Sequence, residues 1–131
     1  YAQNQQVVAL GETGLDKKCT TDFFLQKQVF ERHILLSERL EKPLILHIVS
    51  AYDELLHYKN LFKPKQQWVI HGFRGNEILA KQLLEKNIFL SLGEKYNPNT
   101  LKFLRKHTFF TETDESLFPI KELREQMKIK D

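Results

Sequence analysis

Four polar side chains that could do chemistry each come at the end of a short apolar run of the sequence. They are Glu12, His47, His71 and Asp114. Imidazole and carboxylate groups together bind Zn²⁺, Mn²⁺ or a similar transition metal, whereas oxygen ligands alone would favour Mg²⁺ or Ca²⁺. The four residues are therefore the candidate ligands of a divalent-metal site.

A metal site of this composition has a definite chemistry. Glu12, His47 and His71 would supply three ligands and leave one position open for a water molecule, whose pKa the metal lowers toward neutrality. Asp114 could orient that water or accept its proton, so Glu12 and Asp114 are the candidate catalytic residues. A single histidine at a strand end is more often structural than a ligand, but four such ends in succession favour the metal site.

The remaining histidines and the cysteine are interpreted differently. His33 and His57 fall inside predicted helices, and His107 precedes the last predicted strand, so we assign all three to structural or surface roles. Cys19 is interpreted as an ordinary loop thiol, because no histidine is placed to activate it as a nucleophile.

Short apolar runs predict buried strands at residues 7–10, 44–47, 68–71, 87–93 and 109–114. Apolar residues at helical spacing predict a helix after each strand, over residues 20–40, 50–62 and 76–85, from 97 onward, and over 119–127. Thr20 or Thr21 is expected to cap the first helix and Ser50 the second.

The first strand is expected to end before Glu12. Gly11 and Gly14 would make the following segment a pliable loop that presents the Glu12 carboxylate.

Short strands that are apolar on both faces and alternate with helices predict βα units and a parallel sheet. The expected fold class is α/β, a partial TIM barrel of five consecutive βα units that forms one domain over residues 1–131. The carboxyl ends of the strands carry the chemistry in such a barrel, and all four candidate ligands fall at those ends.

Composition excludes several classes of protein. The 131 residues are 41% apolar and 28% charged, values of a globular rather than a disordered chain. No apolar run is long enough to span a membrane and no signal peptide is visible, so we expect no membrane partner. The single cysteine, Cys19, fits a reducing compartment, and the expected location is cytoplasmic. The net charge of +3 is compatible with a polyanionic partner without requiring one.

Four segments resemble the successive signatures of the TatD family of metal-dependent deoxyribonucleases, within the amidohydrolase superfamily. The segments are Gly-Glu-Thr-Gly-Leu-Asp at 11–16, Pro-Leu-Ile-Leu-His at 43–47, Ile-His-Gly-Phe-Arg-Gly at 70–75 and Thr-Glu-Thr-Asp at 111–114. Their order and spacing agree with the family over nearly the whole chain.

The resemblance implies a TIM barrel that binds one or two divalent ions (Zn, Mn or Mg) and hydrolyses DNA phosphodiester bonds, commonly from the 3′ end. It implies that Glu12 bridges the metals, that His47 and His71 bind one ion, and that Asp114 binds the other or its water. DNA is then the expected substrate.

Three residues in the adjoining loops are further candidates. We interpret Lys17, Phe73 and Arg74 as contacts to the phosphates or bases of the substrate.

The sequence also departs from the family pattern. No His-x-His or His-x-Asp pair precedes Glu12, so the chain is expected to correspond to strands four to eight of a barrel of about 250 residues. The family's His-x-Arg is His47-Ile48-Val49 here, and Glu115-Ser116 replaces the usual Ser/Ala-Pro after Asp114.

These departures lead to two hypotheses. Five strands leave open sheet edges, so a second copy of the chain or a missing N-terminal segment is expected to complete the barrel. One metal is expected to remain bound and the second to be weak.

Two other functions stay open. The same ligands could serve another amidohydrolase-type hydrolysis of a phosphoester or amide. Alternatively, the chain is a catalytically impaired remnant that binds a partner or nucleic acid.

Overall fold

The computed structural model describes residues 3–113 and 119–128. Within them, five β-strands alternate with five α-helices, which confirms the predicted α/β class and the succession of βα units. The chain divides into two compact units, Tyr1–Val69 and Ile70–Asp131, which are described in turn. The interpretation of residues 1–131 as one domain stays a prediction.

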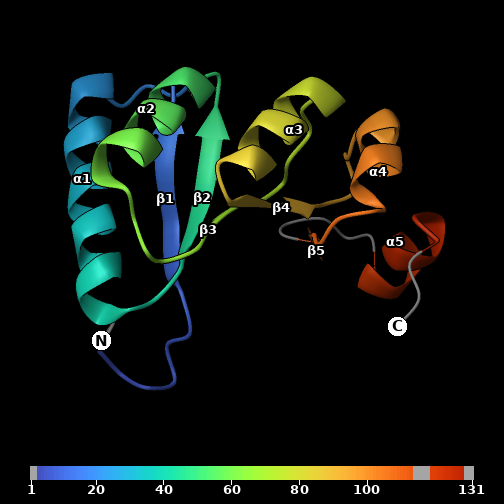
Figure 1. Ribbon diagram of the computed structural model, residues 1–131, viewed down its shortest axis with the longest axis horizontal. Helices are drawn as coiled ribbons and strands as arrows, with labels where there is room; N and C mark the ends of the chain where they lie inside the picture. Colours follow the sequence, from blue (N-terminus) through green and yellow to red (C-terminus); the bar gives the residue numbers. More distant parts are fainter. Residues whose placement is uncertain (1–2, 114–118, 129–131) are drawn as a thin grey trace. The chain divides into compact units, whose positions relative to one another are not determined.

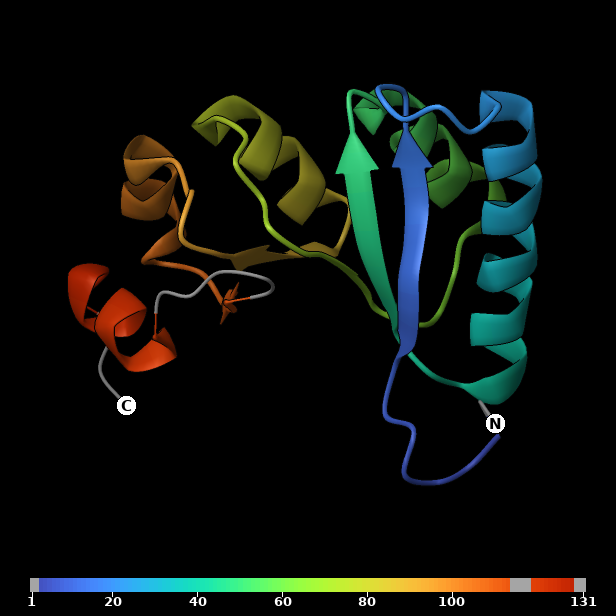
Figure 2. The ribbon, with the colours of Figure 1, turned by 180° about the vertical axis from the view of Figure 1, so that it is seen from behind.

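The first unit contains β1 (Leu10–Asp16), α1 (Phe23–Leu40), β2 (Leu44–Val49) and α2 (Tyr52–Phe62). Strands β1 and β2 lie side by side and pair in parallel (Figures 1 and 2). In the register of this pair, Gly14 lies opposite His47. The strand order is β1-β2-β3-β4-β5, and β3 (Trp68–Ile70) provides its first two residues to this unit.

Helices cover one face of the β1–β2 pair. Helix α1 packs on β1 and α2 packs on β2, and the two ribbon views agree that α2 lies on one side of the strands. The side chains that fill this core are less than a tenth exposed: Leu15, Phe30, Ile34, Leu44, Leu46, Ile48, Leu55, Tyr58 and Trp68. Alternate residues of β2 are only half-buried. The prediction that this strand is buried on both faces is therefore wrong.

Both helices of this unit begin differently from the prediction. Asp22 caps α1, because its carboxylate accepts the backbone N–H of Leu25, and neither Thr20 nor Thr21 does so. Helix α2 follows Ala51, which makes no side-chain cap. Ser50 has a φ of 55° and stands one residue too early to cap the helix.

Strand β1 corrects the expectation for Glu12. The strand begins at Leu10 and continues to Asp16, so Glu12 lies within it and not in a loop after it. The two glycines allow β1 to approach β2 closely. A Cβ on Gly11 would lie 2.7 Å from the carbonyl oxygen of Ile45, and a Cβ on Gly14, whose φ is +148°, would overlap the carbonyl oxygen of His47.

The second unit contains the end of β3, then α3 (Glu77–Glu85), β4 (Ile88–Leu92), α4 (Pro98–Leu104), β5 (Phe110–Thr111) and α5 (Ile120–Gln126). Strands β4 and β5 pair in parallel, and the N–H of Phe73 donates to the carbonyl of Ser91 at 2.9 Å. Asn76 and Asn97 cap α3 and α4, which begin close to the predicted helix starts at 76 and 97. Strand β5 is shorter than the predicted 109–114.

The core of the second unit is formed by fully buried side chains of these elements: Phe73, Ala80, Leu83, Ile88, Leu90, Leu92, Leu104, Leu123 and Met127. Among the described residues, hydrogen bonds join α5 to neighbouring elements. Arg124 donates to the hydroxyl of Thr111 at 3.0 Å, and Arg105 donates to the carbonyl of Met127 at 3.2 Å.

Among the helices of the described residues, each is too short or too polar to cross a bilayer.

We predict that Gly14→Ala destabilises the chain by about 3 kcal/mol, because the new Cβ would push β1 away from β2 and demand an unfavourable φ. Urea unfolding followed by circular dichroism measures the change. Gly93→Ala is the matched control, since its Cβ would meet nothing nearer than 3.7 Å. Equal midpoints for wild type and Gly14→Ala would contradict the close-approach explanation.

A second prediction concerns Tyr58, whose hydroxyl donates to Glu31 at 2.8 Å. Burial, and then the contact with Glu31, raise the pKa of Tyr58 to about 12. The unfolded chain releases this proton near pH 10, so the stabilisation is complete below that pH and is lost as the pH rises toward 12.

Unfolding experiments across this pH range should show that wild type loses about 2 kcal/mol more than Tyr58→Phe does. Tyr96→Phe, in the second unit, should behave as wild type. The same alkaline loss in Tyr58→Phe would show that another group is responsible.

Candidate metal centre

Glu12 and His47 lie on neighbouring strands of the first unit. A carboxylate oxygen of Glu12 and a ring nitrogen of His47 are within 4.8 Å of each other. In β1, Thr13 and Leu15 are buried while Glu12 is exposed, so the alternation of the strand directs the carboxylate away from the helices. His47 occupies the corresponding face of β2, where its side chain is 43% exposed. The sequence predicted both residues, although it placed them at strand ends.

His71, predicted as the last residue of a strand, directly follows β3 and belongs to the second unit. Its side chain is only 12% exposed, and its Nδ1 atom lies 3.4 Å from Oε1 of Glu112. The other oxygen of Glu112 accepts a hydrogen bond from the hydroxyl of Ser91 on β4. Gly72, with a φ of +58°, turns the chain away immediately after the histidine.

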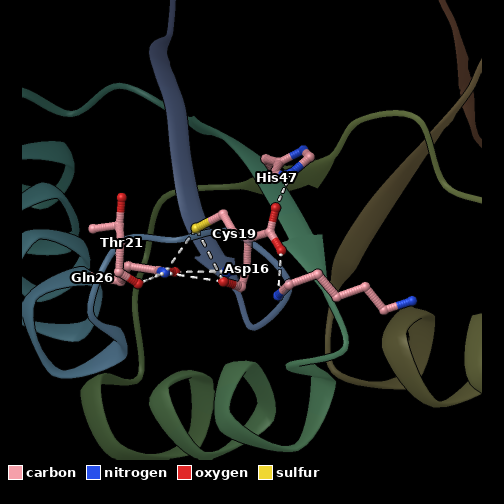
Figure 3. A network of polar contacts seen from close by, with 6 residues as sticks. Asp16, Cys19, Thr21, Gln26 and His47 are labelled. Carbon is pink, nitrogen blue, oxygen red and sulfur yellow. Dashed lines mark hydrogen bonds and ion pairs between the residues drawn. The ribbon is translucent and has the colours of Figure 1, made fainter.

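Asp16 is a site residue that the sequence interpretation missed. Its Oδ2 atom lies 3.2 Å from Nε2 of His47, and its Oδ1 atom accepts the backbone N–H of Lys18 at 2.8 Å (Figure 3). The Lys18 hydrogen bond is the main reason that the pKa of Asp16 lies below its ordinary value. A strand that continues past Glu12 would have revealed this residue, because residues 12, 14 and 16 then share one face.

The loop after β1 is fixed by one glutamine. Gln26 of α1 accepts the N–H of Asp16 at 2.7 Å and donates to the carbonyls of Asp16 and Thr21 at 3.0 and 2.9 Å (Figure 3). Cys19 lies exposed in the same loop, where its thiol donates to the Asp16 carbonyl at 3.3 Å. These bonds hold the backbone that carries the Asp16 carboxylate.

The predicted substrate contacts have different surroundings. The Lys17 ammonium group donates a hydrogen bond to Glu54 within an ion pair. This hydrogen bond is the main reason that the pKa of Glu54 lies below its ordinary value. Phe73 is 1% exposed and belongs to the core of its unit, whereas Arg74 is exposed. Asp114, the fourth predicted ligand, lies outside the described residues.

The other histidines have the structural or surface positions that were expected. His33 contacts the hydroxyl of Thr13 beneath β1. His57 and His107 are both exposed.

The donor atoms of the first unit fit a divalent metal. Carboxylate oxygen and imidazole nitrogen are ligands of Zn²⁺ and related transition metals, at about 2.1 Å from the ion. Two ligands of one ion are then up to about 4.2 Å apart, so a small rotation of the exposed Glu12 side chain closes a separation of at most 4.8 Å.

The chain matches the family model described as TatD related DNase over residues 1–126. An uncharacterized metal-dependent hydrolase of Buchnera aphidicola subsp. Baizongia pistaciae is 32% identical over 87% of this chain and 46% of its own length. The 3′-5′ RNA nuclease TATDN2 of Homo sapiens is 36% identical over 70% of this chain and 12% of its own length.

Two solved structures of TatD proteins are also similar to this chain. The crystal structure of YjjV, a TatD homologue of Escherichia coli K12, is 31% identical, with a TM-score of 0.60 over 68% of this chain and 35% of that one. A TatD family hydrolase of Entamoeba histolytica, 22% identical, shares the fold with a TM-score of 0.70 over 82% of this chain and 39% of that one. The chain spans at most about half the length of these relatives.

Proposed function

The chain belongs to the TatD related DNase family, and from this premise we propose that its site hydrolyses phosphodiester bonds of nucleic acid with a divalent metal ion. The observation that carries the proposal is the approach of the Glu12 carboxylate to the His47 imidazole on neighbouring strands. Relatives named metal-dependent hydrolases support the reaction class.

The proposed ligands are Glu12, His47 and His71. The argument for His71 is topological: it directly follows β3, and β3 is next to β2 in the strand order. The carboxyl ends of the strands carry the chemistry in a βα barrel, so we propose His71 as the third ligand from its position after β3. Zn²⁺, Mn²⁺ and Mg²⁺ are the candidate ions, with one or two bound.

When bound, the ion polarises a phosphoryl oxygen and lowers the pKa of its water. Glu12 would hold the ion from β1 and His47 from β2. We propose that Asp114 orients the attacking water and accepts its proton, a role that carboxylates fill as general bases in hydrolysis.

DNA is the proposed substrate, in keeping with the family description. RNA is the second candidate, because a relative 36% identical to this chain is named an RNA nuclease. Arg74 is exposed and would contact a phosphate group. Lys17 would have to release Glu54 before it could do the same.

Binding without cleavage is the alternative that one observation favours. The chain covers 46% of the Buchnera hydrolase, so the cleavage proposed here would be carried out by about half of such a protein. A binding remnant would keep affinity for nucleic acid and show no metal-stimulated cleavage.

We predict that the chain shortens 3′-labelled single-stranded DNA when Mg²⁺, Mn²⁺ or Zn²⁺ is added, and that a chelator stops the reaction. His71→Ala should lower the rate at least about 100-fold, because it removes a ligand. The matched control is His107→Ala, at an exposed position after α4, which should keep the wild-type rate.

A parallel assay with labelled RNA distinguishes the two substrates. Cleavage of RNA alone would replace DNA as the substrate and leave the reaction class intact. Binding of either strand without cleavage by any of the three ions would contradict the hydrolase proposal and favour the remnant.

A further inference from the structure

Strand β1 is irregular at the place where it carries Glu12. Leu10 lies opposite Leu44 of β2 and Thr13 lies opposite Leu46, so three residue steps along β1 correspond to two along β2. An extra residue of this kind is a β-bulge, which disrupts the strand ladder locally and changes the direction of a side chain. Glu12 lies within the bulge. The direction of its carboxylate therefore depends on how firmly the regular part of the strand, from Thr13 onward, is held.

Thr13 is the first residue of that regular part, and its side chain contacts α1. The Thr13 hydroxyl lies 2.5 Å from Nδ1 of His33. Thr13 is only 8% exposed and His33 is half-buried, so little water competes for this hydrogen bond. A hydroxyl can donate or accept, and the bond can therefore form with either tautomer of a neutral ring. Helix α1 thus holds β1 directly after the bulge.

A second polar side chain of α1 holds the other end of the same segment. The side-chain amide of Gln26 accepts the backbone N–H of Asp16 at 2.7 Å and donates to the Asp16 carbonyl at 3.0 Å (Figure 3). Both backbone groups of Asp16 are therefore bonded to one side chain. This contact fixes the backbone of β1 at its last residue, whatever the Asp16 carboxylate does.

The two contacts are equally spaced on the helix and on the strand. Gln26 and His33 are seven residues apart, which is about two helical turns or roughly 10.5 Å along the helix. Thr13 and Asp16 are three residues apart, which is about 10 Å of extended strand. The earlier residue of the helix bonds the later residue of the strand, so the two elements run in opposite directions. One face of α1 therefore meets β1 at two points of matching separation.

These polar contacts define the position of β1 along α1 more sharply than apolar packing does. Burial of apolar surface has no preferred direction, whereas a hydrogen bond needs its two heavy atoms within about 3.2 Å. A shift of β1 by one residue, about 3.3 Å, would break the contacts of both Gln26 and His33.

We propose that Gln26 and His33 are positioning residues that hold β1 at two points. We call their contacts with Asp16 and Thr13 the α1–β1 clamp. The clamp keeps the regular part of the strand in place, so that the bulge presents Glu12 to the candidate metal site in one position. The consequence for metal binding rests on the proposed function, but the hold on β1 is a property of the metal-free chain.

Native-state hydrogen exchange of the full metal-free chain, followed by NMR, tests the hold at Thr13. Thr13→Val removes the hydroxyl and nearly preserves the shape, whereas Thr13→Ser keeps the hydroxyl. We expect the amides of β1 to exchange about 10-fold faster in Thr13→Val, the effect of losing one hydrogen bond, and the amides of α2 to keep their rates. Thr13→Ser should restore the exchange rates of wild type.

Two outcomes of this experiment would overturn the clamp. Unchanged exchange of β1 in Thr13→Val would show that the hydroxyl does not hold the strand. Equal acceleration in β1 and α2 would show a general loss of stability without a positioning role.

The hold at Asp16 has a matched pair of variants on one helix. Gln26→Ala removes the amide that bonds the Asp16 backbone, and Gln28→Ala removes the same side chain from an exposed position two residues later. The amide of Asp16 should exchange about 10-fold faster in Gln26→Ala and at the wild-type rate in Gln28→Ala. Equal rates in the two variants would overturn this half of the clamp.

Affinity for Zn²⁺ alone, measured by calorimetry on the folded chain, is the second readout. Thr13→Val and Gln26→Ala should bind Zn²⁺ about 10-fold more weakly than Thr13→Ser and Gln28→Ala, because Glu12 is then less well positioned. A contact that only stabilises the fold would lower the urea midpoint and leave the affinity of the folded chain unchanged. That result would overturn the positioning role.

The two readouts separate this inference from the proposed function. A wild type that binds no Zn²⁺ would contradict the proposed function, and the exchange rates of the metal-free chain would then decide the clamp alone. The expected exchange rates and affinity losses in a chain that cleaves no nucleic acid would contradict the hydrolase proposal and support the clamp.

Discussion

The close parallel pairing of β1 with β2 is the constraint on which the candidate site depends. Gly14 lies opposite His47, and a Cβ on Gly14 would overlap the carbonyl oxygen of His47. This approach brings the Glu12 carboxylate within 4.8 Å of the His47 ring. It also places Asp16 beside the same ring, at 3.2 Å. A larger residue at position 14 would push β1 away from β2 and so separate Glu12 and Asp16 from His47.

The two faces of the β1–β2 pair have different roles, since one packs on the helices and the other carries the candidate site. Thr13 and Leu15 of β1, and the alternate leucines of β2, are buried beneath α1 and α2. Glu12 and His47 occupy the opposite face, where they are exposed or half-buried. Side chains of a strand alternate between its two faces, so packing of the apolar side chains on the helices fixes the strand register. That register then places Glu12 and His47 on the opposite face.

Most of the fold could be predicted from the sequence because its signals are local. The βα alternation, the position of His71 at the end of an apolar run, and the helix starts near Asn76 and Asn97 follow from runs and spacings of a few residues. The helix starts at Asp22 and Ala51 could not be separated from nearby serine and threonine alternatives. Capping propensities compete over two or three neighbouring positions at a helix start.

The site was harder to predict, because its remaining contacts depend on register. Glycines at 11 and 14 indicated a loop, and the real strand used them for close contact with β2. A strand that ends before Glu12 gives no reason for Asp16 to face His47. Glu112 was missed for a similar reason, since its partners on β4 and after β3 are distant in the sequence.

The proposed metal site consists of carboxylate and imidazole groups, without the cysteine. X-ray absorption spectroscopy of the zinc-loaded chain measures the ligands most directly. We expect oxygen and nitrogen neighbours at about 2.0 to 2.2 Å, with the outer-shell scattering of imidazole rings. A sulfur neighbour at about 2.3 Å, the distance expected for a cysteine thiolate such as Cys19, or a shell without imidazole, would contradict it.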